Sequence, residues 1–190
     1  MRTMNNATVF YPTDSYKKLL LSAKWLQPNA VTDVNTDVKG WLLETGSMTK
    51  RLKQQCDDLQ VQLIRQRDTK SNETNEKVRG KIGEGPSLLR EVLLVADGTP
   101  WIYGLSYLPK TTLTGKEKAL EKLGASPLGE LVFSSAISRR DALRIAKLYV
   151  EDETLWARCS RLWINDKPLL VYELFLPFCP IYPINLKMQV

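Results

Sequence analysis

Apolar residues between positions 88 and 108 follow the pattern of two paired β-strands. Residues 88–96 are nearly all apolar, Asp97-Gly98 follows, and residues 101–108 are apolar again. An Asp-Gly pair between two such runs favours a tight hairpin turn, because both residues tolerate a positive φ. The sequence therefore predicts an antiparallel hairpin here.

A second hairpin is predicted near the C-terminus. Residues 156–164 and 167–176 are both strand-like, and Asn165-Asp166 between them is another turn sequence. Prolines at positions 177, 180 and 183 then interrupt regular structure, so we expect an irregular tail.

Weaker patterns predict two more strands and a loop. Apolar and polar residues alternate over 59–64, which is typical of a half-buried strand. Residues 140–149 fit a helix or a strand, and the strands that follow favour a strand. The polar segment 68–85 is expected to be a mobile loop or a lid.

Helical patterns occur in four places. The clearest is 114–123, where Thr114 and Glu117 have capping-box spacing and Gly124 stands at the expected C-terminal position. Ser47 or Thr49 is a candidate N-cap for another helix. The other predicted helices cover residues 14–26, 36–44 and 50–56.

Two charged residues, Arg90 and Glu173, lie where strand alternation places apolar ones. The apolar neighbours on the same face are Leu88, Val92 and Leu94 for Arg90, and Leu169, Val171 and Phe175 for Glu173. A buried carboxylate needs a cation or hydrogen-bond donors, and a buried guanidinium needs a carboxylate or an anionic ligand. Two interpretations stay open: a structural ion pair between these side chains, or a chemical site.

Two glycine-containing turns could direct backbone amides at an anion. They are Thr45-Gly46-Ser47-Met48, before a predicted helix, and Ser126-Pro127-Leu128-Gly129. Ordinary capping and turn formation are the alternative for both. The glycines at 80, 83 and 85 fit no phosphate-binding fingerprint.

The composition limits the possible chemistry. The chain has 190 residues, no histidine and a formal net charge of +6. The lack of histidine excludes Ser-His-Asp and Cys-His nucleophile systems, histidine metal ligands and a histidine base. The positive charge fits an anionic small molecule, a nucleic acid or a soluble surface, and the basic residues are spread along the chain.

Cysteine usage and the N-terminal sequence indicate a cytoplasmic, soluble protein. Cys56, Cys159 and Cys179 are odd in number and form no CxxC pair, so neither a disulfide framework nor a zinc site is expected. The sequence shows no signal-peptide pattern and no apolar run of transmembrane length.

Four separated segments form one set: WLLETGSMTKRL (41–52), LLREVLLVADGTPWIYG (88–104), LEKLGASPLGELVF (120–133) and SRLWINDKPLLVYELFLP (160–177). In this order they resemble the chorismate pyruvate-lyase family of bacterial ubiquinone biosynthesis. Two features depart from the family pattern. The segment after Gly104 is less basic than expected, and the 68–85 segment is longer and more polar.

The resemblance implies an α+β fold, a single domain in which a six-stranded antiparallel sheet with flanking helices and loops encloses an internal ligand site. It implies a lyase that converts chorismate into 4-hydroxybenzoate and pyruvate with no cofactor and no metal. By position in the segments, the family's ligand-binding arginine falls on Arg90 and its acidic residue on Glu173. The family's backbone-binding positions fall on Met48 and Leu128.

The resemblance also frames the expected organisation and partners. Residues 1–35 are expected to form an N-terminal arm and residues 36–190 the chorismate lyase-like domain. Chorismate is the expected small-molecule partner of a monomer, with no nucleic acid and no membrane insertion. The main alternative is a non-catalytic domain of the same fold that binds a small aromatic carboxylate, as in transcription regulators. Nucleic-acid binding by the basic surface is a second alternative.

Overall fold

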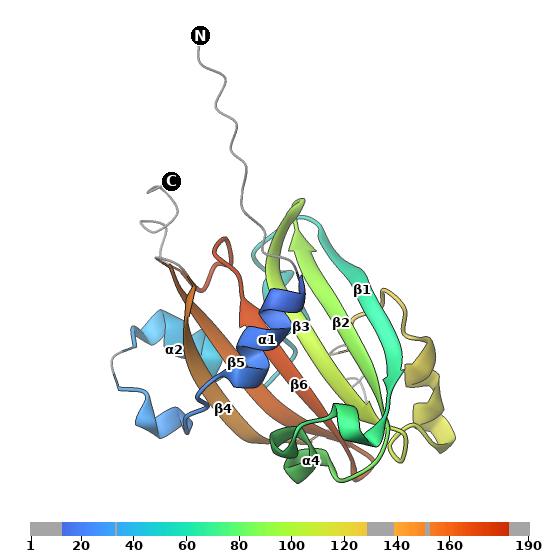
Figure 1. Ribbon diagram of the computed structural model, residues 1–190. Coiled ribbons are helices and arrows are strands. Elements are labelled where there is room, and N and C mark those ends of the chain that lie inside the picture. The colour runs from blue at the N-terminus through green and yellow to red at the C-terminus, as the bar shows by residue number, and fades with distance from the viewer. Residues whose placement is uncertain (1–12, 33, 129–138, 151–152, 183–190) are drawn as a thin grey trace.

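The computed structural model describes residues 13–32, 34–128, 139–150 and 153–182. Within these ranges six strands form one antiparallel sheet in the order β1-β2-β3-β6-β5-β4 (Figure 1). The strands are β1 Leu59–Thr69, β2 Ser87–Ala96, β3 Thr99–Pro109, β4 Arg139–Val150, β5 Glu153–Ile164 and β6 Lys167–Phe175. The predicted six-stranded α+β fold is confirmed.

Both predicted hairpins are present. Asp97 and Gly98 join β2 to β3 with φ values of 47° and 78°, and Asn165 and Asp166 join β5 to β6 with 48° and 60°. Two consecutive positive φ angles are what a two-residue turn needs to match the twist of the strands. The predicted strand over 140–149 is confirmed as β4.

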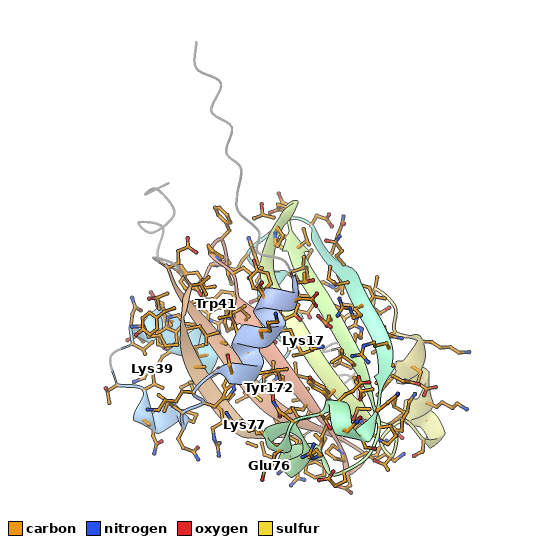
Figure 2. All side chains as sticks on the ribbon, in the orientation of Figure 1. Lys17, Lys39, Trp41, Glu76, Lys77 and Tyr172 are labelled. Atoms are coloured by element: carbon orange, nitrogen blue, oxygen red, sulfur yellow. The ribbon has the colours of Figure 1, made fainter. Side chains whose placement is uncertain are left out.

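The helices are short and lie around the sheet. They are α1 Thr13–Ser22, α2 Thr36–Leu42, α3 Met48–Leu52 and α4 Glu76–Ile82, with 3-10 helices η1 Pro28–Ala30, η2 Ser71–Glu73 and η3 Gly115–Lys122. Helices α1 and α4 cover one face of the sheet, on which Lys17 and Tyr172 also lie (Figures 1 and 2). The predicted cap of α3 is confirmed, because the Ser47 hydroxyl accepts a hydrogen bond from the Lys50 amide at 3.3 Å.

The segment 68–85 is not the mobile loop that the sequence suggested. It contains η2 and α4, and Val78 and Ile82 of α4 are buried in the main core. The Asn75 side chain caps α4 by accepting a hydrogen bond from the Val78 amide at 2.9 Å. Two apolar residues one helical turn apart thus anchor a segment that is otherwise polar.

The predicted helix over 114–123 is a 3-10 helix rather than an α-helix. The capping box does not form, because the Thr114 side chain makes no cap bond and the Glu117 carboxylate is used elsewhere. Glu117 pairs with Lys167 at 2.7 Å and also accepts a hydrogen bond from Asn165. The carboxylate therefore stabilises the β5–β6 turn instead of the helix N-terminus.

The described part of the expected N-terminal arm packs on the sheet. Tyr16 and Leu20 of α1 are buried in the main core, and Leu26 forms a β-bridge with Ile145 of β4. A boundary at residue 35 stays a prediction. None of the three cysteines is in a disulfide. No helix in the described ranges has the length and apolar character needed to cross a membrane.

Candidate active site

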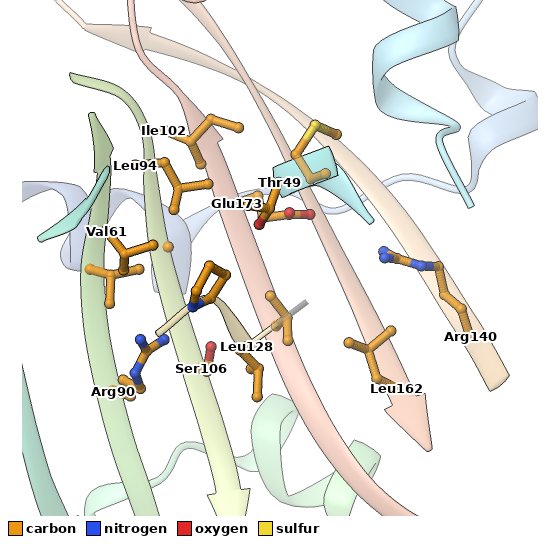
Figure 3. Close-up of a pocket in the computed structure, with 15 residues that line it drawn as sticks. Thr49, Val61, Arg90, Leu94, Ile102, Ser106, Leu128, Arg140, Leu162 and Glu173 are labelled. Carbon is orange, nitrogen blue, oxygen red and sulfur yellow. The ribbon is translucent and has the colours of Figure 1, made fainter. Parts of the chain in front are cut away.

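A pocket lies on the sheet face opposite α1 and α4 (Figure 3). Side chains of all six strands reach this face, as strand alternation allows. The start of α3 and residues Pro127 and Leu128 complete the wall. The lining includes Val61, Val92, Leu94, Ile102, Leu162 and Val171 among apolar residues and Thr49, Arg90, Ser106, Arg140 and Glu173 among polar ones.

Arg90 and Glu173, which sequence analysis selected, both line this pocket. They do not form a pair with each other. Arg90 makes no ion pair within the described residues, whereas Glu173 is paired with Arg158. The interpretation of Arg90 and Glu173 as a mutual structural ion pair is therefore wrong.

Arg90 is a buried cation whose described hydrogen bonds go to neutral groups. Its exposed fraction is 2%, and its Nη2 donates to the carbonyls of Gly124 and Ser126 at 2.9 and 2.8 Å. Its Nε is buried and makes no hydrogen bond in the described structure. Burial lowers the pKa of Arg90 to about 10. A guanidinium in this state is a strong site for an anion.

Glu173 is held by a neighbouring strand. Its carboxylate accepts a hydrogen bond from Nε of Arg158, the residue directly opposite it in the β5–β6 register. Arg158 is fully buried, and its Nη1 donates to the Glu44 carbonyl at 2.7 Å. Arg158 therefore fixes the Glu173 carboxylate and the loop before α3 at the same time.

Arg140 of β4 is a half-buried arginine on the pocket wall. Its Nη1 donates to the Ser160 hydroxyl at 2.7 Å, and its Nη2 donates to the Gly46 carbonyl at 3.3 Å. Burial, and then the nearby Arg158 charge, lower the pKa of Arg140 to about 10. Sequence analysis selected neither Arg140 nor Arg158.

Met48 and Leu128, the expected backbone-binding positions, lie on the pocket wall. Met48 is the first residue of α3, where amides have no partner within the helix. Leu128 follows the turn whose Gly124 and Ser126 carbonyls are bound by Arg90. The same arginine thus stabilises the wall that carries Leu128.

The pocket is narrow. Its volume is about 60 Å³, below the roughly 300–1,000 Å³ of typical ligand sites. Ligand entry therefore requires side chains of the wall to move apart. Helix α4 cannot act as the predicted lid over this pocket, because it packs on the opposite face, where Lys81 Nζ lies 3.3 Å from Cys159 Sγ.

The fold and the pocket define a class of protein: an antiparallel α+β domain with an internal, arginine-rich site for a small anionic ligand. The chain belongs to the chorismate lyase family, whose sequence profile matches residues 19–186.

Similar proteins agree with this assignment. The chain is 46% identical to a "Probable chorismate pyruvate-lyase" of Photobacterium profundum, with 88% of this chain and 93% of the relative covered. It is 41% identical to one of Vibrio vulnificus, with 90% and 96% covered. It is 44% identical to a "Chorismate pyruvate-lyase" of Escherichia coli, with 78% and 88% covered.

Among solved structures, the effector domain of PhnF from Mycobacterium smegmatis is similar in fold. The TM-score is 0.52 at 16% identity, over 70% of this chain and 90% of that domain. At this identity the likeness concerns the fold alone.

Proposed function

We propose that this protein is a chorismate pyruvate-lyase that converts chorismate into 4-hydroxybenzoate and pyruvate and so supplies 4-hydroxybenzoate for ubiquinone biosynthesis. The observation that carries the proposal is Arg90. Arg90 is buried in the pocket of this chain, which is a member of the chorismate lyase family. Its Nε makes no hydrogen bond, and it has no carboxylate partner within the described residues. The ring carboxylate of the substrate supplies the missing anion.

Each proposed binding residue has one task. Arg90 binds the ring carboxylate through two parallel hydrogen bonds, one from Nε and one from an Nη2 N–H that gives up its carbonyl acceptor. The backbone amides of Met48 and Leu128 add neutral donors around it. Glu173 accepts a hydrogen bond from the ring hydroxyl and fixes the ring between the two ends of the pocket.

The reaction needs positioning and charge stabilisation more than it needs a reactive side chain. The bond between the ring and the ether oxygen breaks, the adjacent ring carbon, which carries the hydroxyl, loses its hydrogen, and the enolpyruvyl methylene gains one to become the methyl group of pyruvate. All atoms of chorismate appear in the two products, and formation of the aromatic ring drives the reaction. Holding the reactive conformer accounts for the role of the protein, and no histidine is needed.

The ion pair with Arg158 supports an acceptor role for Glu173 rather than an acid role, because its carboxylate already accepts a hydrogen bond from the guanidinium. We therefore favour transfer of the ring hydrogen to the methylene within the substrate. Chorismate deuterated at the ring carbon that carries the hydroxyl tests this route. Deuterium in the pyruvate methyl group is expected, and its complete loss to water would contradict direct transfer.

We also propose that the protein works in the cytoplasm as a monomer. Cys159 is a buried thiol outside any disulfide, as is usual in a reducing compartment. Analytical ultracentrifugation is expected to give a single species near 21.7 kDa. A stable dimer at micromolar concentration would contradict the monomer.

The decisive experiment is incubation of the purified protein with chorismate in the presence of a chelator. We expect 4-hydroxybenzoate, measured by absorbance, and pyruvate, measured by a coupled assay, in equal amounts. Binding of 4-hydroxybenzoate without turnover would favour the non-catalytic binding domain instead. Salt-dependent binding of DNA or RNA would favour the nucleic-acid alternative.

A further inference from the structure

We propose that the Ser106 hydroxyl donates a further hydrogen bond to the ring carboxylate that Arg90 binds, and so helps the pocket to select a carboxylate. This inference rests on the proposed function and adds a specificity-determining residue to it. Ser106 belongs to β3 and is directly opposite Arg90 in the β2–β3 register. Both residues line the pocket, and Figure 3 shows the Ser106 side chain beside the Arg90 guanidinium.

The place of Ser106 along β3 fits the carboxylate end of the substrate. Gly104, two residues earlier on the same strand, is directly opposite Glu173 in the β3–β6 register. Two residues of a strand span about 7 Å, which is comparable to the distance between the carboxyl and hydroxyl groups on a benzene ring when they are para to each other. A ring whose hydroxyl is held by Glu173 therefore brings its carboxylate to Ser106 and Arg90.

The Ser106 hydroxyl is buried and has no partner in the described structure. Its residue is 5% exposed, and the hydroxyl makes no hydrogen bond with any described residue. Alanine at this position would avoid the cost of burying an unpaired hydroxyl. A buried donor that faces a pocket is accounted for when a ligand supplies its acceptor.

The other cross-strand neighbour of Arg90 is not available to a ligand. This neighbour is Gln66 of β1, which is directly opposite Arg90 in the β1–β2 register. Its amide donates to the Glu121 carbonyl at 2.8 Å, and it is not among the described residues that line the pocket. Ser106 is therefore the neighbour of Arg90 whose donor a ligand can reach.

A single carboxylate can use both residues at once. Its two oxygens offer about four lone-pair positions. The fork of Arg90, formed by the unbonded Nε and one Nη2 N–H, takes one position on each oxygen. The Ser106 hydroxyl rotates freely and can donate to one of the remaining positions, and a bond from a hydroxyl to an ionised acceptor is short and strong.

A purely structural role for Ser106 makes a different prediction. If the side chain only fills space, its replacement changes the binding of every ligand of the pocket to the same extent, or of none. A bond to the ring carboxylate predicts a loss that is confined to ligands with this group. Phenol separates the two cases, because it keeps the ring hydroxyl and lacks the carboxylate.

The test compares Ser106→Ala and Ser106→Cys with Ser87→Ala. Cysteine is similar to serine in size, and its thiol is a weak donor. Ser87 is the matched control, because it is also a buried serine, lies on β2 and is not among the described residues that line the pocket. For each protein, NMR titration gives the Kd of 4-hydroxybenzoate and of phenol, and thermal unfolding checks the fold.

Both Ser106 variants should bind 4-hydroxybenzoate about 10- to 150-fold more weakly, the loss that corresponds to one hydrogen bond to a charged group. The Kd of phenol should change less than about threefold, and Ser87→Ala should match the unmodified protein for both ligands. The ring carboxylate is bound equally in the substrate and in the transition state. The KM for chorismate should therefore rise in the Ser106 variants, with no fall in kcat beyond about threefold.

Equal loss of affinity for both ligands, or unchanged affinity for 4-hydroxybenzoate in the Ser106 variants, would overturn the assignment. A loss in Ser106→Ala that Ser106→Cys does not share would also overturn it, because the volume of the side chain would then explain the effect. Selective loss of 4-hydroxybenzoate binding without chorismate turnover by the unmodified protein would support the role of Ser106 and overturn the proposed lyase activity alone.

Discussion

Arg90 and Glu91 are neighbours on β2 and face opposite sides of the sheet. Both are buried, but they differ in whether oppositely charged groups lie nearby. On the α1 face, Glu91 accepts a hydrogen bond from the Tyr103 hydroxyl at 2.7 Å and lies 3.6 Å from both Lys17 and Arg65. On the pocket face, the hydrogen bonds of Arg90 in the described structure go only to carbonyl groups.

The difference separates structural charge from functional charge. A buried charge surrounded by opposite charges and donors is compensated within the protein and needs nothing further. A buried charge without a counter-ion carries a desolvation cost that an incoming ion can offset. Glu91, whose Oε1 lies near two cations although it makes no hydrogen bond in the described structure, therefore belongs to the packing of α1 on the sheet, and we propose that Arg90 binds the ligand.

The largest expected effect is on catalysis by Arg90→Met. We predict that kcat/KM for chorismate falls about 100- to 10,000-fold, because two charge-assisted hydrogen bonds to the substrate are lost. The free energy of unfolding should change by less than about 2 kcal/mol, since relief of desolvation offsets the lost bonds to carbonyls. Steady-state kinetics and urea unfolding measure the two. Activity within about tenfold of the unmodified protein would contradict the assignment of Arg90 to ligand binding.

Glu173→Gln should affect both properties. Loss of the carboxylate weakens the hold on the ring hydroxyl, and kcat should fall about 10- to 150-fold. It also leaves Arg158 without its counter-ion, so the free energy of unfolding should fall by about 1–3 kcal/mol. Full activity with reduced stability would show that Glu173 only supports the fold.

Tyr103→Phe tests the other face. It removes a donor from the buried Glu91 carboxylate, and we predict a loss of about 1–3 kcal/mol in the free energy of unfolding with kcat/KM within twofold. Tyr107→Phe is the matched control, because it removes a buried hydroxyl on the same strand face that does not donate to Glu91 in the described structure. A tenfold loss of activity in Tyr103→Phe, without loss of stability, would contradict the division between the two faces.

The smallest expected effect is on the pH dependence of stability. It concerns Glu117, a second carboxylate that is paired with a cation within the protein. Bonds from Lys167 and then Asn165 lower the pKa of Glu117 to about 2, from an ordinary value of 4.5. The unfolded chain therefore binds a proton at a higher pH than the folded one, and this contribution to stability is present above pH 4.5 and is lost as the pH falls toward 2. Glu117→Gln should therefore make the melting temperature depend less on pH in that window. An unchanged pH dependence would show that the pair contributes nothing.

The sequence predicts the sheet well because its turns are local. Asp97-Gly98 and Asn165-Asp166 define two hairpins through their own backbone preferences. The helical segments are predicted less well, because tertiary contacts decide them. Glu117 forms no capping box because its carboxylate pairs with Lys167. Helix α4 is stabilised by core contacts that its mostly polar sequence does not predict.

The residues of the site also divide into those that local sequence predicts and those that tertiary structure decides. Alternation alone identifies Arg90 and Glu173 as charged residues among apolar ones, and the family resemblance assigns them to a ligand site. Arg158 could also have been found, because a two-residue turn pairs Ile164 with Lys167 and so places Arg158 opposite Glu173. Arg140 could not have been found in this way. Its place depends on the β4–β5 register, which shifts between Asp141 and Arg144 at an irregularity.

The most direct test of the central claim is calorimetric binding of 4-hydroxybenzoate and of its uncharged amide, 4-hydroxybenzamide, to the unmodified protein and to Arg90→Met. If the buried guanidinium awaits the ring carboxylate, the unmodified protein should bind the acid at least about 100-fold more tightly than the amide, and the variant should lose nearly all of that preference. An equal preference for the acid in both proteins would contradict the account.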